Sequence, residues 1–150
     1  MTNADSPAAQ IRRLLTQSSR AYLGTLAERG GEIFPFASLV LPGLDAVSRP
    51  LLLLSDLSDH ARNLRRDPHA SLLYDGTAVL KEPLTGPRAT LIGRVEAADN
   101  AENRRLYLEA QPSAAQYAGF GDFHLYGFEI QEALLVAGFG KIHRVAGNAL

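Results

Sequence analysis

The segment from Leu51 to Tyr74 constrains the fold more than any other part of this sequence. It reads LLLLSDLSDHARNLRRDPHASLLY: an apolar strand, a Ser-Asp-Leu-Ser turn, a short basic helix and a second strand. Ser58 is a suitable N-cap, because its hydroxyl can accept a hydrogen bond from a backbone N–H of the first turn. Asp67-Pro68 ends the helix, since proline disfavours helical geometry in the residue before it. We therefore expect one short helix between two apolar strands, Leu51–Leu54 and Ala70–Asp75, that pair with each other.

Most of the other elements that the pattern predicts are strands separated by turns. The expected strands are Ala21–Glu28, Phe34–Leu41, Leu51–Leu54, Ala70–Asp75, Arg88–Ala97 and His124–Val136. Helices are expected over Asn100–Glu109, with Leu106 facing the core, and over Gln111–Ala118. Because helices between the strands are few, the crossovers that a parallel sheet requires are scarce. The sequence thus predicts a mainly β fold, a six-stranded antiparallel barrel with peripheral helices.

The chain length is that of one domain. Its 150 residues are enough to bury a core, so we expect a single domain over residues 1–150. Residues 1–9 are predicted to form a disordered N-terminal segment. Ser6-Pro7 nevertheless has the order of a helix cap and a first helical residue, and apolar side chains follow at helical spacing from Ile11 to Leu15.

Composition excludes several classes of function. The net charge of −1 and a pI near 6.4 argue against nucleic-acid binding, which favours a basic excess. The chain has no cysteine, so disulfides, thiolate metal sites and cysteine nucleophiles are excluded. Apolar runs such as Ala133–Ala137 are too short to span a bilayer, and the N-terminus lacks a signal pattern. We expect a cytoplasmic protein with no membrane partner. The four histidines lack HExxH spacing, and we expect no metal site.

The turn after Leu51–Leu54 has the composition of an anion site. Two hydroxyls, Ser55 and Ser58, lie beside the free N–H groups of a helix N-terminus, with arginines close by in the sequence. The alternative is a capped connecting helix whose arginines are solvated. A second glycine-containing turn, Gly138-Phe139-Gly140-Lys141, lacks the glycine spacing of a phosphate loop and is interpreted as the end of a strand.

Three segments together resemble a known family. SDLSDHARNLRRDPHASLL, RATLIGRVEAAD and VAGFGKIHRV, in this order, are similar to the FMN-binding split-barrel family, which includes pyridoxamine 5′-phosphate oxidase. The haem-utilisation (HugZ-like) branch is closer to this chain. The resemblance covers roughly residues 10–145 and implies a six-stranded antiparallel split barrel. It also implies a homodimer, with one FMN in each of two clefts between the subunits.

The resemblance assigns residues to the cofactor. It places Ala37, Ser38 and Leu39 beside the flavin ring, and Ser55, Ser58 and His60 at the phosphate. Further contacts are expected from Arg62, Arg88 and Lys141. One departure concerns Asp59, a carboxylate at a position where the oxidase carries a cation. If Asp59 points inward, phosphate affinity falls; if it points outward, it favours the helix N-terminus.

Three functions follow from the resemblance. The first is an FMN-dependent oxidoreductase that lacks the substrate motif of pyridoxamine phosphate oxidase and to which no catalytic residue is assigned. The second is a haem-binding protein, in which each of the four histidines, His60, His69, His124 and His143, can supply an axial nitrogen. His143 is the preferred ligand because Lys141 and Arg144 beside it suit haem propionates. The third is a non-catalytic flavin carrier.

Overall fold

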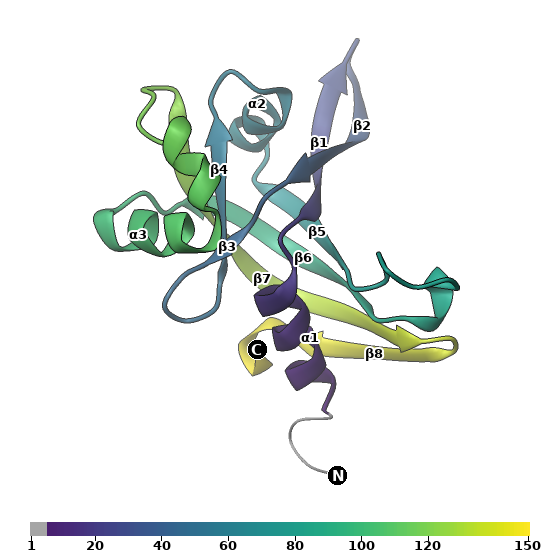
Figure 1. Cartoon of the computed structure of the whole chain (residues 1–150). Coiled ribbons are helices and arrows are strands. Elements are labelled where there is room, and N and C mark those ends of the chain that lie inside the picture. The colour runs from purple at the N-terminus through teal and green to yellow at the C-terminus, as the bar shows by residue number, and fades with distance from the viewer. Residues whose placement is uncertain (1–5) are drawn as a thin grey trace.

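A computed structural model describes residues 6–150 of this chain, which form one eight-stranded sheet and three α-helices (Figure 1). The strands are β1 (Ala21–Arg29), β2 (Glu32–Val40), β3 (Gly43–Leu44), β4 (Pro50–Ser55), β5 (His69–Asp75), β6 (Arg88–Ala97), β7 (Phe123–Gly138) and β8 (Lys141–Ala146). The α-helices are α1 (Pro7–Gln17), α2 (Asp59–Arg66) and α3 (Ala101–Ala110), and the 3-10 helices are η2 (Pro83–Thr85), η3 (Pro112–Gln116) and η4 (Gly147–Ala149).

All strand pairs are antiparallel, in the order β2-β1-β5-β6-β7-β4-β3, and β8 adds to β7. The long strand β7 holds the sheet together, because its first part pairs with β4, its later part pairs with β8, and β6 runs beside it. At the ends of this order, β2 pairs only with β1, and the β4 side is extended only by the two-residue β3. The barrel is therefore split between β2 and β4.

The core fills the inside of the sheet. Strand residues alternate between the two faces, and the inward ones are fully buried, among them Leu23, Leu72, Leu91 and Phe128. The helix α1 packs against β5, β6, β7 and β8 and buries Ile11, Leu14 and Leu15 (Figure 1). A second, smaller buried cluster lies where α3 covers β3 and β4, and it contains Leu51, Tyr107, Ala114 and Leu125.

The expected strands are all present, but one expected pairing is wrong. β4 and β5 do not pair with each other: β4 pairs with β7, and β5 lies between β1 and β6. The reason lies in α2, which packs on β1 through a buried hydrogen bond of 3.0 Å from the Asn63 amide to the Thr25 hydroxyl. This contact carries the chain across the barrel end, so that the next strand joins β1. The short strands β3 and β8 were not expected.

Two local expectations also need correction. Residues 7–9 are not disordered: they form the first turn of α1, capped by the Ser6 hydroxyl, which accepts a hydrogen bond from the Ala9 N–H. Residues 1–5 of the predicted disordered segment lie outside the described residues. In α3 the buried side chains are Asn103 and Tyr107, and Leu106 is only half-buried, because the helix turns its tyrosine toward β2 and β3. No helix within residues 6–150 has the length and apolar character needed to cross a membrane.

Candidate functional site

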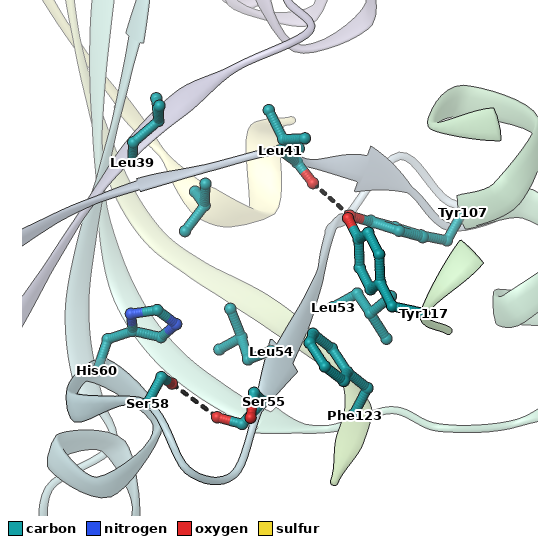
Figure 2. A pocket seen from close by; sticks show the side chains of 11 residues that line it. Leu39, Leu41, Leu53, Leu54, Ser55, Ser58, His60, Tyr107, Tyr117 and Phe123 are labelled. Atoms are coloured by element: carbon teal, nitrogen blue, oxygen red, sulfur yellow. Dashed lines mark hydrogen bonds between the residues drawn. The ribbon is translucent and has the colours of Figure 1, made fainter. Parts of the chain in front are cut away.

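The split between β2 and β4 contains a cavity of about 430 Å³ (Figure 2). It is lined from β2 and the residue after it, from β4, from the start of α2, from α3 and the segment after it, and from the first residue of β7. The lining residues are Leu39, Val40, Leu41, Leu53, Leu54, Ser55, Ser58, His60, Tyr107, Tyr117 and Phe123.

Most of the cavity wall is apolar or aromatic. Leu39 and Leu41 form one side, and Tyr117 and Phe123 lie on another, with ring centroids 4.9 Å apart and planes tilted by 47° (Figure 2). The Tyr107 hydroxyl donates a hydrogen bond of 2.7 Å to the carbonyl of Leu41, which fixes α3 against the end of β2. The apolar walls are thus built from segments far apart in the sequence, and a hydrogen bond between two of the lining residues joins them.

The polar end of the cavity is the turn between β4 and α2. Ser58 caps α2: its hydroxyl donates to the Ser55 carbonyl (2.6 Å) and accepts from the Ala61 N–H (3.3 Å). The Ser55 hydroxyl donates to Oδ2 of Asp122 (2.6 Å) and accepts from the Leu57 N–H (3.2 Å). The hydroxyl hydrogens of both serines are therefore engaged within the protein, although both residues line the cavity as expected.

The carboxylate hydrogen-bonded to this corner is Asp122, which does not itself line the cavity, and not Asp59. Asp59 is more than half exposed and faces Arg29 and Arg62, at 4.0 and 3.9 Å. Asp122 bonds the Ser55 hydroxyl directly. Arg62, expected to supply charge to a phosphate, is therefore paired with Asp59 on the surface and does not line the cavity.

A second carboxylate, Asp56, follows Ser55 and binds three neighbours. It accepts a hydrogen bond from the Tyr126 hydroxyl (2.9 Å), lies 2.8 Å from Nδ1 of His124 and 3.8 Å from Arg65. The hydrogen bond to Asp56 and burial raise the pKa of Tyr126, with burial the larger cause. The positive charge near the turn is thus already balanced by carboxylates of the protein.

His60 lies in the first turn of α2 and directs its imidazole into the cavity (Figure 2). Burial lowers the pKa of His60, against the opposing attraction of the Asp59 carboxylate. The ring is therefore neutral at neutral pH, with a lone pair on one nitrogen. Neither ring nitrogen has a hydrogen-bond partner among residues 6–150. The cavity thus presents one neutral imidazole between apolar walls.

Comparison with known proteins identifies the family. The family model described as "CREG, beta-barrel" matches residues 2–149. The chain belongs to the CREG beta-barrel family. A curated relative, the chloroplastic non-canonical heme oxygenase HOZ of Arabidopsis thaliana, is 35% identical over 136 residues, which are 89% of this chain and 41% of that protein.

Solved structures place this CREG beta-barrel among split barrels. A heme binding protein from Mycobacterium smegmatis superposes with a TM-score of 0.87 at 31% identity, covering 96% of this chain and 59% of that one. A protein of the pyridoxinephosphate oxidase family from Clostridium acetobutylicum superposes with a TM-score of 0.69 at 13% identity, covering 93% and 94% of the two chains, and this match shows the fold alone. The split-barrel family expected from the sequence is confirmed. The chain spans less than two thirds of the length of both haem-named relatives.

The CREG beta-barrel brings only some of the expected cofactor residues together. Leu39, Ser55, Ser58 and His60 line one cavity. Ala37 and Ser38 lie on β2 next to Leu39 but do not line the cavity.

The expected residues from β6 and β8 lie elsewhere within one subunit. Arg88 donates hydrogen bonds to the carbonyls of Leu84 and Gly86, and Lys141 and His143 are exposed on β8. Arg88 pairs with Val136 near one end of β7, whereas Ser55 pairs with Phe123 at the other end. At about 3.3 Å per residue, these positions are on the order of 40 Å apart along the strand.

Sequence reasoning missed the aromatic part of the cavity. Tyr107 comes from α3, Tyr117 follows η3, and Phe123 is the first residue of β7. The sequence pattern assigned the two tyrosines to peripheral helices and left Phe123 between a helix and a strand. The available signal was the cluster of aromatic residues and glycines between Tyr117 and Phe123, a composition typical of a binding loop. Within residues 6–150, no group of three or more His, Asp or Glu side chains is arranged to hold a metal ion.

Proposed function

We propose that this chain binds haem in the cavity between β2 and β4. The observation that carries the proposal is a cavity with apolar and aromatic walls and a single neutral imidazole, His60, directed into it. The heme oxygenase of Arabidopsis thaliana and the heme binding protein of Mycobacterium smegmatis, both above 30% identity, support the same ligand.

The cavity suits the chemistry of a porphyrin. A porphyrin is flat and largely apolar, so it is stabilised by aliphatic and aromatic side chains such as Leu39, Leu54 and Phe123. A volume of about 430 Å³ lies within the range of small-molecule sites, which are mostly apolar with few polar groups. Haem, when bound, supplies one-electron and oxygen chemistry, and the protein positions it and excludes water.

FMN, the ligand that the sequence favoured, fits the polar end less well. A flavin phosphate needs unengaged donors and positive charge. Here the Ser55 hydroxyl already donates to the carboxylate of Asp122, and the Ser58 hydroxyl donates to a backbone carbonyl. Arg62 faces Asp59 instead of the cavity. The competing proposal is therefore that this chain binds FMN, either as an oxidoreductase or as a flavin carrier.

Titration of the purified protein with hemin and, separately, with FMN tests the proposal. We expect one hemin per chain with a shifted Soret band, and an affinity for FMN at least tenfold lower. Tighter binding of FMN than of hemin would favour the flavoprotein. Binding of neither ligand would contradict both.

A pair of variants locates the site. Leu41→Asp places a charge in the cavity wall, and we expect it to weaken hemin binding at least tenfold, because a carboxylate would be buried against the ring. The matched control is Leu80→Asp: Leu80 is 39% exposed, Leu41 is 38% exposed, and Leu80 lies outside this cavity. Equal affinities of the two variants would place the haem elsewhere.

A further inference from the structure

Histidine side chains occur at four positions, and all four lie in the described part of the chain. Only His60 lines the cavity. His69 and His124 have Nδ1 2.6 Å from Asp67 and 2.8 Å from Asp56. His143 is exposed on β8 and faces Leu135 in the β7–β8 register, toward the end of β7 remote from Phe123. The fold thus brings one imidazole to the proposed haem site.

The helix α2, which carries His60, is fixed by hydrogen bonds at its N-terminus, in its middle and at its C-terminus. The Ser58 cap joins its N-terminus to the end of β4. In its middle, the buried Asn63 side chain donates to the Thr25 hydroxyl at 3.0 Å. At its C-terminus, the Arg66 guanidinium donates to the carbonyl of Leu26 in β1. A ligand on a rigid element reaches its metal without ordering a flexible segment, so less free energy is lost on binding.

The state of the imidazole also suits a metal ligand. A histidine binds iron through the lone pair of its neutral ring, and a protonated ring has none. His60 lines the cavity, and neither of its ring nitrogens is engaged by another group in residues 6–150. No hydrogen bond to another residue of this part of the chain therefore has to be broken before the nitrogen can coordinate.

We infer that His60 supplies the axial nitrogen to the iron of a haem held between the Leu39–Leu41 wall and β4. This role rests on the haem binding proposed above. It replaces His143, which the sequence favoured and which lies on β8, outside the cavity.

The experiment compares hemin-loaded protein with four single variants, His60→Ala, His69→Ala, His124→Ala and His143→Ala. Each sample is reduced and exposed to nitric oxide, and the electron paramagnetic resonance spectrum is recorded. An imidazole opposite the nitric oxide adds splitting from a second nitrogen. We expect this splitting in the wild type and in the three control variants and its loss in His60→Ala. We also expect His60→Ala to bind hemin about tenfold more weakly, which is about 1.4 kcal/mol.

Added imidazole separates a lost ligand from a damaged fold. We expect millimolar imidazole to restore the splitting in His60→Ala, which a misfolded cavity would not permit. Retention of the second-nitrogen splitting in His60→Ala, or its loss in His143→Ala alone, would overturn the assignment while haem binding itself stands. A wild type that takes up no hemin would instead refute the proposed function, and the assignment with it.

Discussion

The Ser55 hydroxyl donates a hydrogen bond of 2.6 Å to the Asp122 carboxylate across a separation of 67 residues. The bond joins the end of β4 to the residue before β7, and the Asp56 N–H reinforces it by donating to the Asp122 carbonyl at 2.7 Å. A negative charge therefore lies in the corner where the resemblance to FMN-binding proteins places a phosphate. No local segment of the sequence reveals this contact.

Removing that charge is expected to improve flavin binding. In Asp122→Asn the repulsion of the phosphate is lost, so we expect FMN affinity to rise about tenfold, equivalent to about 1.4 kcal/mol. Quenching of flavin fluorescence measures this. Asp59→Asn is the control, and we expect it to change little because Asp59 faces Arg29 and Arg62 outside the cavity. If Asp59→Asn gives the larger rise, Asp59 is the residue that repels the phosphate.

The ion pair of Asp99 and Arg104 predicts a loss of stability in acid. Two hydrogen bonds, of 2.7 and 2.8 Å, join the guanidinium to the carboxylate and lower the pKa of Asp99 below its ordinary value of 3.8. The folded state thus binds the proton less readily than the unfolded state. The stabilisation is complete above pH 3.8 and is lost as the pH falls through the lower pKa of the folded state.

Urea denaturation at neutral pH and near pH 3 tests this. Since both side chains are partly exposed, we expect the pair to contribute under about 1 kcal/mol. Asp99→Asn should lose stability at neutral pH and show a smaller acid effect than the wild type. Glu109→Gln, in the exposed pair with Arg105, serves as the control and should leave the pH dependence unchanged. Equal acid effects in the wild type and Asp99→Asn would contradict the prediction.

The local sequence predicts the individual strands and helices, but it does not predict which strands pair with one another. The range Arg88–Ala97 predicted from apolar periodicity is the range of β6, because alternation is a property of the strand itself. The pairing of β4 was predicted wrongly, since its partner β7 lies about 70 residues further along the chain, and no local pattern reports such contacts. The hydrogen bond between Asn63 and Thr25, which joins α2 to β1 beside β5, is equally non-local.

The same division holds for the cavity. The Ser58 cap and the placing of His60 in the first turn of α2 are local features and were predictable. Tyr107 and Phe123 reach the cavity only through packing of α3 and the pairing of β4 with β7. Within one subunit Lys141 lies toward the other end of β7, and the sequence does not show how far a long strand carries the residues after it.

Gly93 is expected to be intolerant of any side chain. A Cβ at this position would lie 1.8 Å from the carbonyl oxygen of Glu129, at the bulge where the β6–β7 register shifts. The strands would have to separate, so Gly93→Ala should cost about 3 kcal/mol of unfolding free energy. Gly119→Ala is the matched control: no atom lies within 4 Å of its added Cβ, and we expect a change within about 0.5 kcal/mol. Similar urea midpoints for the two variants would show that the bulge accommodates a side chain at little cost in stability.

The outer face of the sheet predicts a homodimer. Tyr22 pairs in register with both Leu39 and Leu73, and these side chains are 40%, 60% and 36% exposed on that one face. Contiguous apolar area of this kind marks an interaction surface. Because Leu39 also lines the cavity, a second copy on this face would close one side of the proposed haem site.

Sedimentation of the wild type and two variants checks the dimer. We expect the wild type to sediment as a dimer at micromolar concentration and Leu73→Asp to sediment as a monomer, since a carboxylate would be buried in the interface. Leu73→Asp should also bind hemin more weakly, although Leu73 does not touch the cavity, because the partner no longer covers Leu39. Val47→Asp, on a loop residue that is 80% exposed, should change neither property. A monomeric wild type with full hemin affinity would show that one subunit completes the site alone.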